Sequence, residues 1–400
     1  MPESILRVAF ASHGSSLDGG AERCLLDVAI ALKQDGRVDP VVTVPSDGAL
    51  AAALRAESIR SFVLPTPWWT WTSANPDLSR PLASVRGLAR RGWLIARSAA
   101  PWFVWLRAER PDVVVTNTAV IPTPALASAV AGIPHVWWLH EFVTKDHGFR
   151  YALGEPLSQR SIGWLSKLVV ANSRAVQGHF SPPIRTDKMR VIYQGIVGFD
   201  ASPNTIDPPN LRALVVGSLT PAKGVALALE AASILKSEAI HMELRLVGPI
   251  RAAYREELNR LAADLGIADS VEVVGATMTP QAEFPWANVI LMCSRSEAFG
   301  RVTVESLKSG RPVVGTRSGG TTELISDGVN GFLFAPGNAQ ELASALRRLA
   351  TEPGLLALMS ENARPSVQDC FTIEGEVNGL VAVLRAAAGR EAQDLRRRLG

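Results

Sequence analysis

Two glutamates, Glu297 and Glu305, are the residues whose type and spacing most clearly indicate chemistry. Glu297 falls in a turn after the apolar run 289–292, and Glu305 lies inside a helix that begins at Phe299-Gly300. The pattern predicts two carboxylates and a helix N-terminus around one crevice. A helix N-terminus binds phosphate through unpaired backbone N–H groups, and carboxylates accept hydrogen bonds from neighbouring hydroxyls. A ligand with phosphates flanked by hydroxyls is a nucleotide sugar.

The segment around these glutamates resembles a known family. Residues 294–336 contain Gly310-Arg311-Pro312-Val313-Val314, Gly319-Gly320, Glu323 and Asn330-Gly331 in addition to the two glutamates. This combination resembles the donor half of the retaining glycosyltransferases of family 4, which have the GT-B fold. The alternative is a helix with two solvated surface carboxylates, which a glutamate pair without the glycines would indicate.

The resemblance implies roles for individual residues. Glu297 would bind sugar hydroxyls near the reacting carbon, and Glu305 would hold the ribose. The implied donor contacts also include backbone N–H groups of Phe299 and Gly300, the phosphate neighbour Thr303, and Gly248 beside the nucleobase.

A lysine in the loop 217–224 is the candidate for stabilising the leaving group. Lys223 follows a predicted strand, and a fixed cation there would neutralise the charge that develops on a departing nucleoside diphosphate. The family commonly has an arginine where this chain has Ser218, so Arg301 is a candidate for the missing phosphate contact. The alternative reading of Lys223 is an exposed side chain before a glycine.

Near the N-terminus, Asp18-Gly19-Gly20-Ala21-Glu22 resembles the glycine loop of the same family. Glycines let backbone N–H groups approach a phosphate closely, so Gly19 and Gly20 are predicted to contact the donor. The spacing of Gly14, Gly19 and Gly20 is not the dinucleotide fingerprint, so no nicotinamide or flavin cofactor is expected. An ordinary strand-to-helix turn is the alternative.

A histidine follows the predicted strand 135–139. His140 is thus placed at the carboxyl end of a strand, where open α/β sheets bind ligands. The resemblance implies that it stabilises or orients the sugar near the reactive carbon, although a satisfied polar residue is the alternative. His13 and Glu141 are weaker candidates, and residues 172–174 are candidates for the acceptor side.

Short apolar runs alternate with helical sequence in both halves of the chain. This alternation predicts an α/β protein with parallel sheets. The resemblance implies the GT-B arrangement of two Rossmann-like domains facing each other across a deep cleft. We expect an acceptor-side domain over residues 1–199, a linker over 200–210 and a donor-binding domain over 211–384, with a C-terminal helix over about 385–400 packing back on the first domain.

Composition excludes several classes of function. A net charge of +3 over 400 residues gives no reason to expect a nucleic-acid partner. The three cysteines have no metal-ligand spacing, and the candidate loops contain no Asp-x-Asp motif, so neither a metal nor a cofactor is expected. No secretory signal and no apolar run of membrane-spanning length are visible, so we expect a cytoplasmic protein.

Tryptophan and arginine are concentrated in residues 67–107. Six of the ten tryptophans lie there among arginines. One interpretation is peripheral association with an anionic membrane, at its inner face, which would bring the protein to a lipid-linked acceptor. The other is that the tryptophans pack a helix onto the first domain while the arginines are solvated.

Together these features predict a metal-independent, retaining hexosyltransferase. It would move a hexose from a nucleotide-diphosphate sugar to a glycan or lipid-linked acceptor in polysaccharide or glycolipid biosynthesis. The alternatives are a GT-B sugar-nucleotide epimerase or hydrolase, and a non-catalytic nucleotide-sugar-binding protein.

Overall fold

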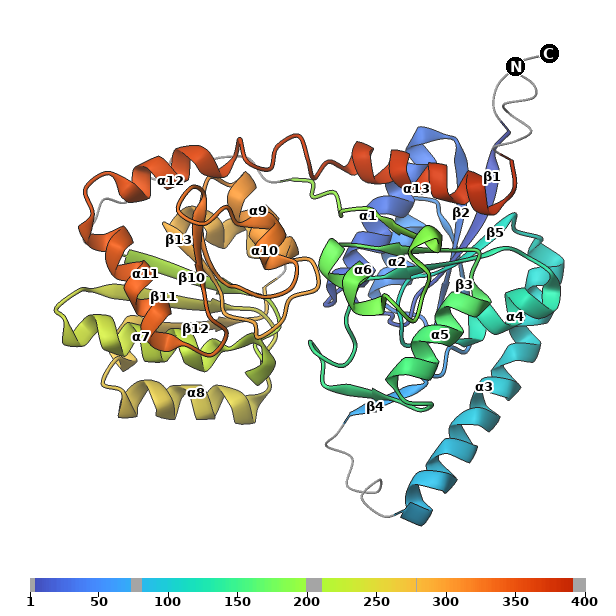
Figure 1. Cartoon of the computed structure of the whole chain (residues 1–400), viewed down its shortest axis with the longest axis horizontal. Helices are drawn as coiled ribbons and strands as arrows, with labels where there is room; N and C mark the ends of the chain where they lie inside the picture. Colours follow the sequence, from blue (N-terminus) through green and yellow to red (C-terminus); the bar gives the residue numbers. More distant parts are fainter. Residues whose placement is uncertain (1–3, 73–80, 199–210, 278, 391–400) are drawn as a thin grey trace. The chain divides into compact units, whose positions relative to one another are not determined.

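The computed structural model describes residues 4–72, 81–198, 211–277 and 279–390, with the side chains of residues 72 and 81–85 left aside. The chain divides into two compact units (Figure 1). Unit 1 contains Met1–Gly195 and Ile373–Gly400, and unit 2 contains Ile196–Thr372. The chain passes between the units at 195/196 and again at 372/373, whereas the predicted boundaries were 199 and 384. The predicted linker 200–210 lies outside the described residues.

Unit 1 is built on a seven-stranded parallel sheet in the order β3-β2-β1-β5-β6-β8-β9. The strands are β1 (Leu6–Ala11), β2 (Val38–Val44), β3 (Arg60–Val63), β5 (Val113–Thr116), β6 (His135–Leu139), β8 (Leu168–Ala171) and β9 (Met189–Val191). The helices are α1 (Gly20–Asp35), α2 (Ala49–Ala56), α3 (Pro81–Glu109), α4 (Thr123–Ala131), α5 (Glu155–Leu165), α6 (Arg174–Phe180) and α13 (Ile373–Ala387).

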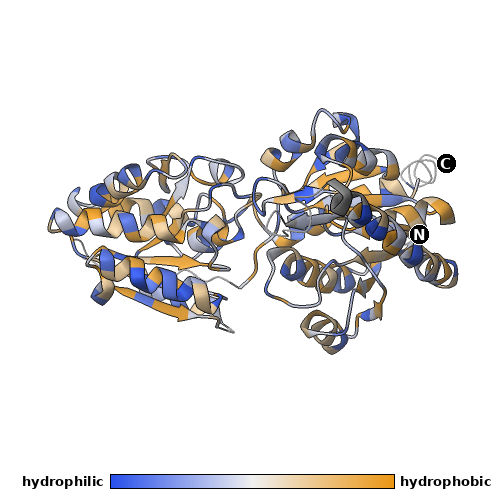
Figure 2. Ribbon diagram, turned by 90° about the horizontal axis from the view of Figure 1, so that it is seen from below, coloured by the Kyte–Doolittle hydropathy of each residue, from blue (hydrophilic) through white to orange (hydrophobic). Residues whose placement is uncertain are grey.

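The central strands of unit 1 are mostly hydrophobic and largely buried. Strands β5 and β6 have every residue buried, as expected of a parallel sheet covered on both faces. Figure 2 shows the strands of both sheets coloured mainly as hydrophobic. Such buried apolar runs are the ones that the sequence analysis interpreted as parallel strands, 135–139 among them, whereas β3 is short and partly exposed.

Two additions extend unit 1. A small antiparallel sheet pairs β4 (Thr70–Thr72) with β7 (Phe149–Tyr151), and α3 packs against α4. Two of the tryptophans pack in the interior of unit 1: Trp69 is stacked on Trp137, and Trp102 is buried with its indole N–H donating to the carbonyl of Pro65.

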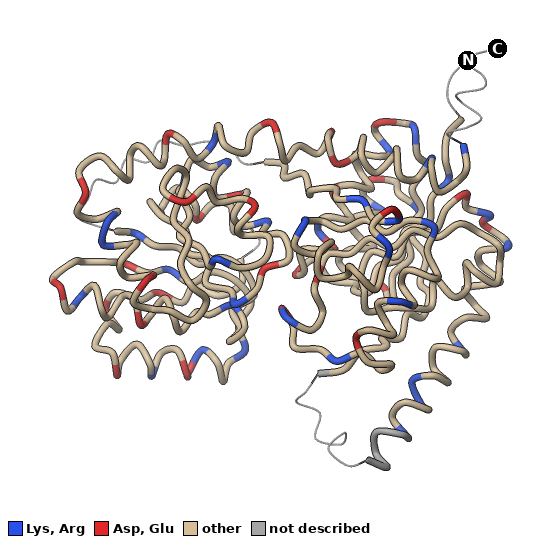
Figure 3. The backbone as a smooth tube through the Cα atoms, viewed as in Figure 1, with Lys and Arg blue, Asp and Glu red and all other residues tan. Residues whose placement is uncertain are grey.

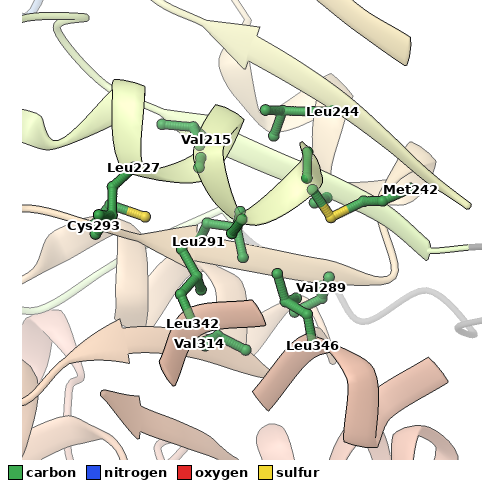
Figure 4. Close-up of a cluster of buried hydrophobic side chains, with 14 of the residues drawn as sticks. Val215, Leu227, Met242, Leu244, Val289, Leu291, Cys293, Val314, Leu342 and Leu346 are labelled. Carbon is green, nitrogen blue, oxygen red and sulfur yellow. The ribbon is translucent and has the colours of Figure 1, made fainter. Parts of the chain in front are cut away.

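Unit 2 has a six-stranded parallel sheet in the order β12-β11-β10-β13-β14-β15. Its strands are β10 (Leu211–Val216), β11 (Met242–Val247), β12 (Val271–Gly275), β13 (Val289–Met292), β14 (Val313–Thr316) and β15 (Gly331–Phe334). Its helices are α7 (Val225–Ser237), α8 (Ala252–Asp264), α9 (Arg301–Lys308), α10 (Thr321–Leu324), α11 (Ala339–Thr351) and α12 (Leu355–Ala363). Figure 4 shows the core, where Val215 and Leu291 of the sheet pack with Leu227, Leu342 and Leu346 of the helices.

Helix α13 returns the chain to unit 1. It packs against α1, and its buried Glu376 accepts hydrogen bonds from the backbone N–H of Gly195 and from the thiol of Cys24. The helix begins at Ile373, earlier than the predicted return at about 385, and residues 391–400 of that prediction lie outside the described part of the chain. The sequence pattern predicted a C-terminal helix but not the residue at which the chain returns to unit 1.

Candidate functional site

The ion pair of Lys223 and Glu297 is the centre of the candidate site in unit 2. Lys223 ends a short 3₁₀ helix (Pro221–Lys223) after β10, and Glu297 lies in the turn between β13 and α9. The lysine Nζ is 2.8 Å from Oε2 of Glu297, and the two side chains are 38% and 17% exposed. The structure therefore brings together the predicted cation and the predicted sugar-binding carboxylate, both within reach of solvent.

Backbone packing fixes the two loops that carry this pair. Gly224 has φ +66°, and a Cβ there would lie 2.2 Å from the carbonyl oxygen of Cys293 at the end of β13. The backbone N–H of Arg295 donates to the carbonyl of Ala222 at 3.3 Å. Only glycine allows this approach, so Gly224 places Lys223 beside the segment that contains Glu297.

Gly319 and Gly320 pack directly against the Glu297 turn. The N–H of Gly320 donates to the carbonyl of Glu297 at 2.7 Å. A Cβ on Gly319 would lie 2.1 Å from that same oxygen, and a Cβ on Gly320 would lie 2.6 Å from the carbonyl oxygens of Ala298 and Phe299. These glycines of the family motif therefore shape the turn rather than leave room for a ligand.

Helix α9 begins at the turn, as the sequence predicted. Gly300 is its N-cap in the left-handed conformation, with φ +104°, and Thr303 in the first turn is fully buried. Arg301 Nε lies 3.9 Å from Oε1 of Glu305, so both side chains belong to the same part of the site. The N-terminus of the helix thus lies on the same face of unit 2 as two cationic side chains, Lys223 beside Glu297 and Arg301 beside Glu305.

The other residues predicted to contact the donor differ in burial and packing. Ser218, also predicted to contact the donor, is exposed, and this contact stays a prediction. Phe299 is buried, with its ring 5.8 Å from the ring of Phe371. Gly248 has φ +138°, and a Cβ there would lie 1.9 Å from the carbonyl oxygen of Gly217, so its packing against the end of β10 already requires glycine. Contact of Gly248 with a nucleobase stays a prediction.

The glycine loop of unit 1 already encloses a carboxylate. The side chain of Glu22, which is 7% exposed, reaches back from α1 to this loop. A Cβ added at Gly14 would lie 2.2 Å from Oε1 of Glu22, and a Cβ added at Gly19 would lie 2.1 Å from its Oε2. Its Oε1 is also 3.2 Å from His13 Nε2, and burial lowers the pKa of His13 while Glu22 opposes this shift. A phosphate placed against Gly19 would meet a like charge, and a contact through the backbone of Gly20 stays a prediction.

His140 follows β6 and is almost fully buried. Its Nε2 lies 2.7 Å from Oδ1 of Asn117, and its Nδ1 lies 2.7 Å from Nε2 of Gln194. The side chain of Asn172 donates to the carbonyl of His140 at 3.1 Å, while Ser173 caps α6. Both ring nitrogens of His140 have hydrogen-bond partners, as the structural alternative predicts. Its position at the end of β6 is the one predicted for a functional histidine.

Sequence reasoning did not select Asn117 and Gln194. Asn117 directly follows β5, the neighbour of β6, so the strand-end signal that selected His140 also applied to it. Gln194 follows β9, which was not predicted as a strand because it is only three residues long.

Glu141, next to His140, has an unusual environment. Its Oε1 accepts hydrogen bonds from the hydroxyl of Thr118 at 2.5 Å and from the backbone N–H of Ala119 at 2.6 Å. Burial raises the pKa of Glu141 to about 7, and these two hydrogen bonds only partly offset the effect. The carboxyl group is therefore anchored in unit 1 rather than directed outward.

Within the described residues, no group of three or more His, Cys, Asp or Glu side chains is arranged to hold a metal ion. Cys24 and Cys293 are buried and Cys370 is exposed, all three as reduced thiols, and burial raises the pKa of Cys293 to about 12. No helix in the described parts of the chain has the length and hydropathy needed to cross a membrane.

Comparison with known families decides what this arrangement belongs to. Residues 18–197 match the family model described as Glycosyltransferase Family 4, and residues 199–366 match the model described as Glycosyl transferases group 1. The chain belongs to these glycosyltransferases. The two matches meet near the point where the chain leaves unit 1 for unit 2.

Solved structures of other proteins confirm the GT-B fold of this glycosyltransferase. HepE of Anabaena, solved in complex with UDP and glucose, superimposes with a TM-score of 0.75 at 25% identity, over 95% of this chain and 100% of that one. A glycosyltransferase of lipopolysaccharide biosynthesis, WaaG, superimposes with a TM-score of 0.67 over 94% of this chain and 99% of that one, at 19% identity. The predicted α/β, GT-B fold class is correct.

Curated relatives are also named as glycosyltransferases. A D-inositol 3-phosphate glycosyltransferase of Acidothermus cellulolyticus is 36% identical over 184 residues, which is 44% of this chain and 40% of the relative. An MMP alpha-(1->4)-mannosyltransferase of Mycolicibacterium hassiacum is 26% identical over 297 residues, which is 70% of this chain and 72% of the relative. The chain thus spans only about two-fifths of the length of the first of these relatives.

Proposed function

We propose that the chain is a retaining hexosyltransferase that takes its sugar from a nucleoside-diphosphate donor and transfers it to a glycan or lipid-linked acceptor. The observation that carries this proposal is the contact of Lys223 with Glu297 beside the N-terminus of α9. The HepE complexes with UDP and with UDP-glucose support a nucleotide-sugar donor, and the names of the curated relatives, a D-inositol 3-phosphate glycosyltransferase and an MMP alpha-(1->4)-mannosyltransferase, support glycosyl transfer.

The charges of unit 2 suit departure of a diphosphate. The bond between the anomeric carbon and the diphosphate oxygen breaks, the acceptor oxygen bonds to that carbon, and the acceptor's proton passes to the departing diphosphate. Lys223 donates a hydrogen bond to Glu297 and carries a full positive charge. With Arg301 and the helix N-terminus, this cation supplies the stabilisation for which many transferases use a metal, and we propose that neither a metal nor a bound cofactor is required.

Product analysis tests the proposal. The protein is incubated with UDP-, GDP- and ADP-hexoses and a panel of sugar, inositol-phosphate and lipid-linked acceptors, with EDTA present, and the anomer formed is read by NMR. Transfer with the donor's anomeric configuration kept supports the proposal. Inversion, or transfer only after a divalent metal is added, contradicts the corresponding part.

A non-catalytic nucleotide-sugar-binding protein is the second candidate. The absence of an arginine at Ser218 favours it, because one phosphate contact of the family is lost there. A thermal shift with nucleoside diphosphates, without turnover on any acceptor or in water, would select this candidate. Consumption of donor without acceptor would instead select an epimerase or hydrolase.

One face of α3 supports access to a lipid-linked acceptor. Its exposed residues recur at helical spacing: Arg86, Arg90, Trp93, Arg97, Val104 and Arg107. Figure 3 shows basic residues along this helix. Over residues 86–109 the single acid is Glu109, and it pairs with Arg60 at 2.8 Å. The packing interpretation holds for Trp69 and Trp102, whereas Trp93 is 56% exposed beneath the guanidinium of Arg97.

This face fits the headgroup region of an anionic membrane. Arginines attract acidic headgroups, and an exposed tryptophan prefers the interface between headgroups and acyl chains. We propose that the enzyme acts in the cytoplasm at the inner face of the membrane. The net charge of +3 gives no reason to propose a nucleic-acid partner.

Vesicle flotation tests this placement. Binding to phosphatidylcholine–phosphatidylglycerol vesicles is expected at low salt and is lost at high salt, whereas vesicles of phosphatidylcholine alone should not bind. Trp93→Ala and the triple change of Arg86, Arg90 and Arg97 to Ala should weaken flotation. Trp164→Ala, at a tryptophan of α5 that is 72% exposed, is the matched control. Equal flotation of wild type and the triple variant would remove α3 from the proposal.

A further inference from the structure

Four aromatic rings lie in a row on unit 1, beginning at its glycine loop. The centroid of the Trp68 ring is 5.5 Å from that of His13 and 5.7 Å from that of Phe149. His147 is stacked on Phe149, with centroids 5.5 Å apart and an interplanar angle of 24°. Trp68 and Phe149 are half-buried, and the side chains of His13 and His147 are 18% and 51% exposed. We call these four residues the aromatic row.

The backbone that carries Trp68 is held in place on both sides. The carbonyls of Trp68 and Thr70 both accept hydrogen bonds from Nη1 of Arg91, at 3.0 and 2.8 Å. The next residue, Trp69, is buried, and its indole N–H donates to the carbonyl of Ala119 at 2.8 Å. Since Trp69 is already packed in the interior, the Trp68 ring remains as the one that this segment presents to the aromatic row.

The cationic side chains of this region are directed to other rings. Arg91 lies 5.4 Å from the ring centre of Trp71, and Lys145 lies 5.8 Å from that of Phe142. Arg150 is opposite Trp71 in the pairing of β4 with β7. Side chains alternate along a strand, so Arg150 and its neighbour Phe149 point to opposite faces of this small sheet. The aromatic row therefore lies on the face away from Arg150.

The end of the aromatic row at His13 has polar groups and a negative charge. Nε2 of His13 is 3.2 Å from Oε1 of Glu22, the carboxylate enclosed by the glycine loop. Nδ1 of His13 is buried and has no hydrogen-bond partner among the residues that the structure describes, and such atoms commonly bind water or a ligand. Burial lowers the pKa of His13 more than Glu22 raises it, so the ring is uncharged at neutral pH.

We propose that the aromatic row binds the acceptor through an uncharged sugar ring, which packs one face on Trp68 and Phe149 and directs hydroxyls to the end formed by His13 and Glu22. The inference rests on the proposed function and names the class of acceptor that unit 1 would take. The C–H groups on one face of a pyranose carry partial positive charge, which suits the negative face of an aromatic ring. Aromatic walls with a few polar groups are typical of small-molecule sites.

The charge at Glu22 decides between two kinds of acceptor. A phosphate placed at this end of the aromatic row would meet the carboxylate, and like charges repel. A hydroxyl can instead donate a hydrogen bond to a carboxylate oxygen. We therefore expect an acceptor that ends in a neutral glycan unit rather than in a sugar phosphate.

Binding is measured on the full chain without any donor, so that the result does not depend on turnover. Saturation-transfer NMR is recorded with the methyl glycosides of glucose, galactose and mannose, with maltose and lactose, and with the 6-phosphates of the three hexoses. We expect at least one neutral sugar to bind, with the strongest signals from protons on one ring face, and its 6-phosphate to bind at least about fivefold more weakly. No signal from any neutral sugar, or tighter binding of the phosphates, would overturn the inference.

Two variants of the aromatic row test which rings bind the sugar. Trp68→Ala and Phe149→Leu should each weaken binding about three- to tenfold, because each removes one aromatic face. Phe149→Leu keeps the apolar bulk, so it tests the row even where Trp68→Ala folds poorly. Trp164→Ala, at the exposed tryptophan of α5, is the matched control and should bind as wild type does. Unchanged affinity in both variants of the row would overturn the inference.

A third variant tests the role of the carboxylate. Glu22→Gln keeps the shape of the side chain and removes its charge, so it should bring the affinity for the hexose 6-phosphate close to that for the neutral sugar. Glu57→Gln removes a charge at the exposed end of α2 and should leave the preference as in wild type. An unchanged preference in Glu22→Gln would overturn the selection against phosphate.

Kinetics separate this inference from the proposed function. In the transfer reaction, Trp68→Ala and Phe149→Leu should raise KM for the acceptor by the same factors, with little change in KM for the donor. Transfer by the wild type, with wild-type acceptor KM in both variants, would overturn the inference while the proposed function stands. Sugar binding that depends on Trp68, without transfer from any nucleotide sugar, would instead overturn the proposed function.

Discussion

Lys223 and Glu297, which are 74 positions apart in the sequence, form an ion pair at 2.8 Å on unit 2. Neither residue is deeply buried, so the pair stabilises the folded state by about 1 kcal/mol at most. Under the proposed function both residues also contact the donor.

The first prediction concerns this pair. Lys223→Ala and Glu297→Ala should each lower the rate of sugar transfer by about a hundredfold or more, because each removes a preorganised electrostatic contact to the donor. The double variant should lose less than the product of the two effects, since the residues contact each other. Initial rates at low and saturating donor measure both effects.

Lys236→Ala is the control for the Lys223 variant. Lys236 is a solvent-exposed lysine of the same unit whose Nζ contacts the carbonyl of Gly266 away from the candidate site. Its variant should keep wild-type rates. Wild-type rates in Lys223→Ala and Glu297→Ala as well would rule out the site described above.

The second prediction tests whether donor binding requires the close packing of Gly319 against the Glu297 turn, apart from the backbone strain of an alanine at positive φ. Gly319 and Gly337 both have positive φ, at +59° and +79°, but a Cβ meets Glu297 only at Gly319 and finds open space at Gly337. Gly337→Ala should cost only the strain of a left-handed alanine, about 1 to 2 kcal/mol. Gly319→Ala must also displace the turn, so it should abolish the thermal shift caused by nucleoside diphosphate. If both variants keep equal shifts, the turn does not bind the donor.

The third prediction concerns the pH dependence of stability at Glu141. Its folded-state pKa of about 7 lies above the ordinary value of 4.5, so the folded state binds the extra proton between these values. The resulting stabilisation is complete below about pH 4.5 and is lost as pH rises through 7. Glu141→Gln cannot ionise and can still accept both hydrogen bonds, so its stability relative to wild type should increase from pH 5 to pH 8.

Urea unfolding at a series of pH values checks this expectation. The difference between variant and wild type is the quantity to compare, because buried His135, with a pKa of about 3, changes stability with the opposite sign over part of the same range. A constant difference from pH 5 to pH 8 would show that Glu141 ionises normally.

The fourth prediction concerns Lys308, which joins the two places where the chain enters and leaves unit 2. Its Nζ donates to the carbonyls of Ile196 at 2.6 Å and Phe371 at 2.9 Å, and these two residues share a backbone hydrogen bond of 3.1 Å. Lys308→Met keeps the bulk but leaves both carbonyls without this donor, which should lower the unfolding free energy by about 1 to 3 kcal/mol. Faster hydrogen exchange at the Ile196 amide would accompany the loss, whereas Lys236→Met should leave that amide unchanged.

The sequence by itself determined the fold class and much of the donor side. Apolar runs alternating with helical sequence predicted the parallel strands, and local spacing predicted both the turn at Glu297 and the helix that contains Glu305. Such features are legible because they depend on period, burial and backbone conformation within a few residues.

The tertiary structure decided which distant residues meet. It paired Lys223 with Glu297, placed Gly319 and Gly320 under the turn, and moved the return to unit 1 from about 385 to Ile373. It also put the carboxylate of Glu22 inside the glycine loop and enclosed His140 between Asn117 and Gln194. These contacts join strands and loops far apart in the chain, and only the register and order of the sheets bring such residues together.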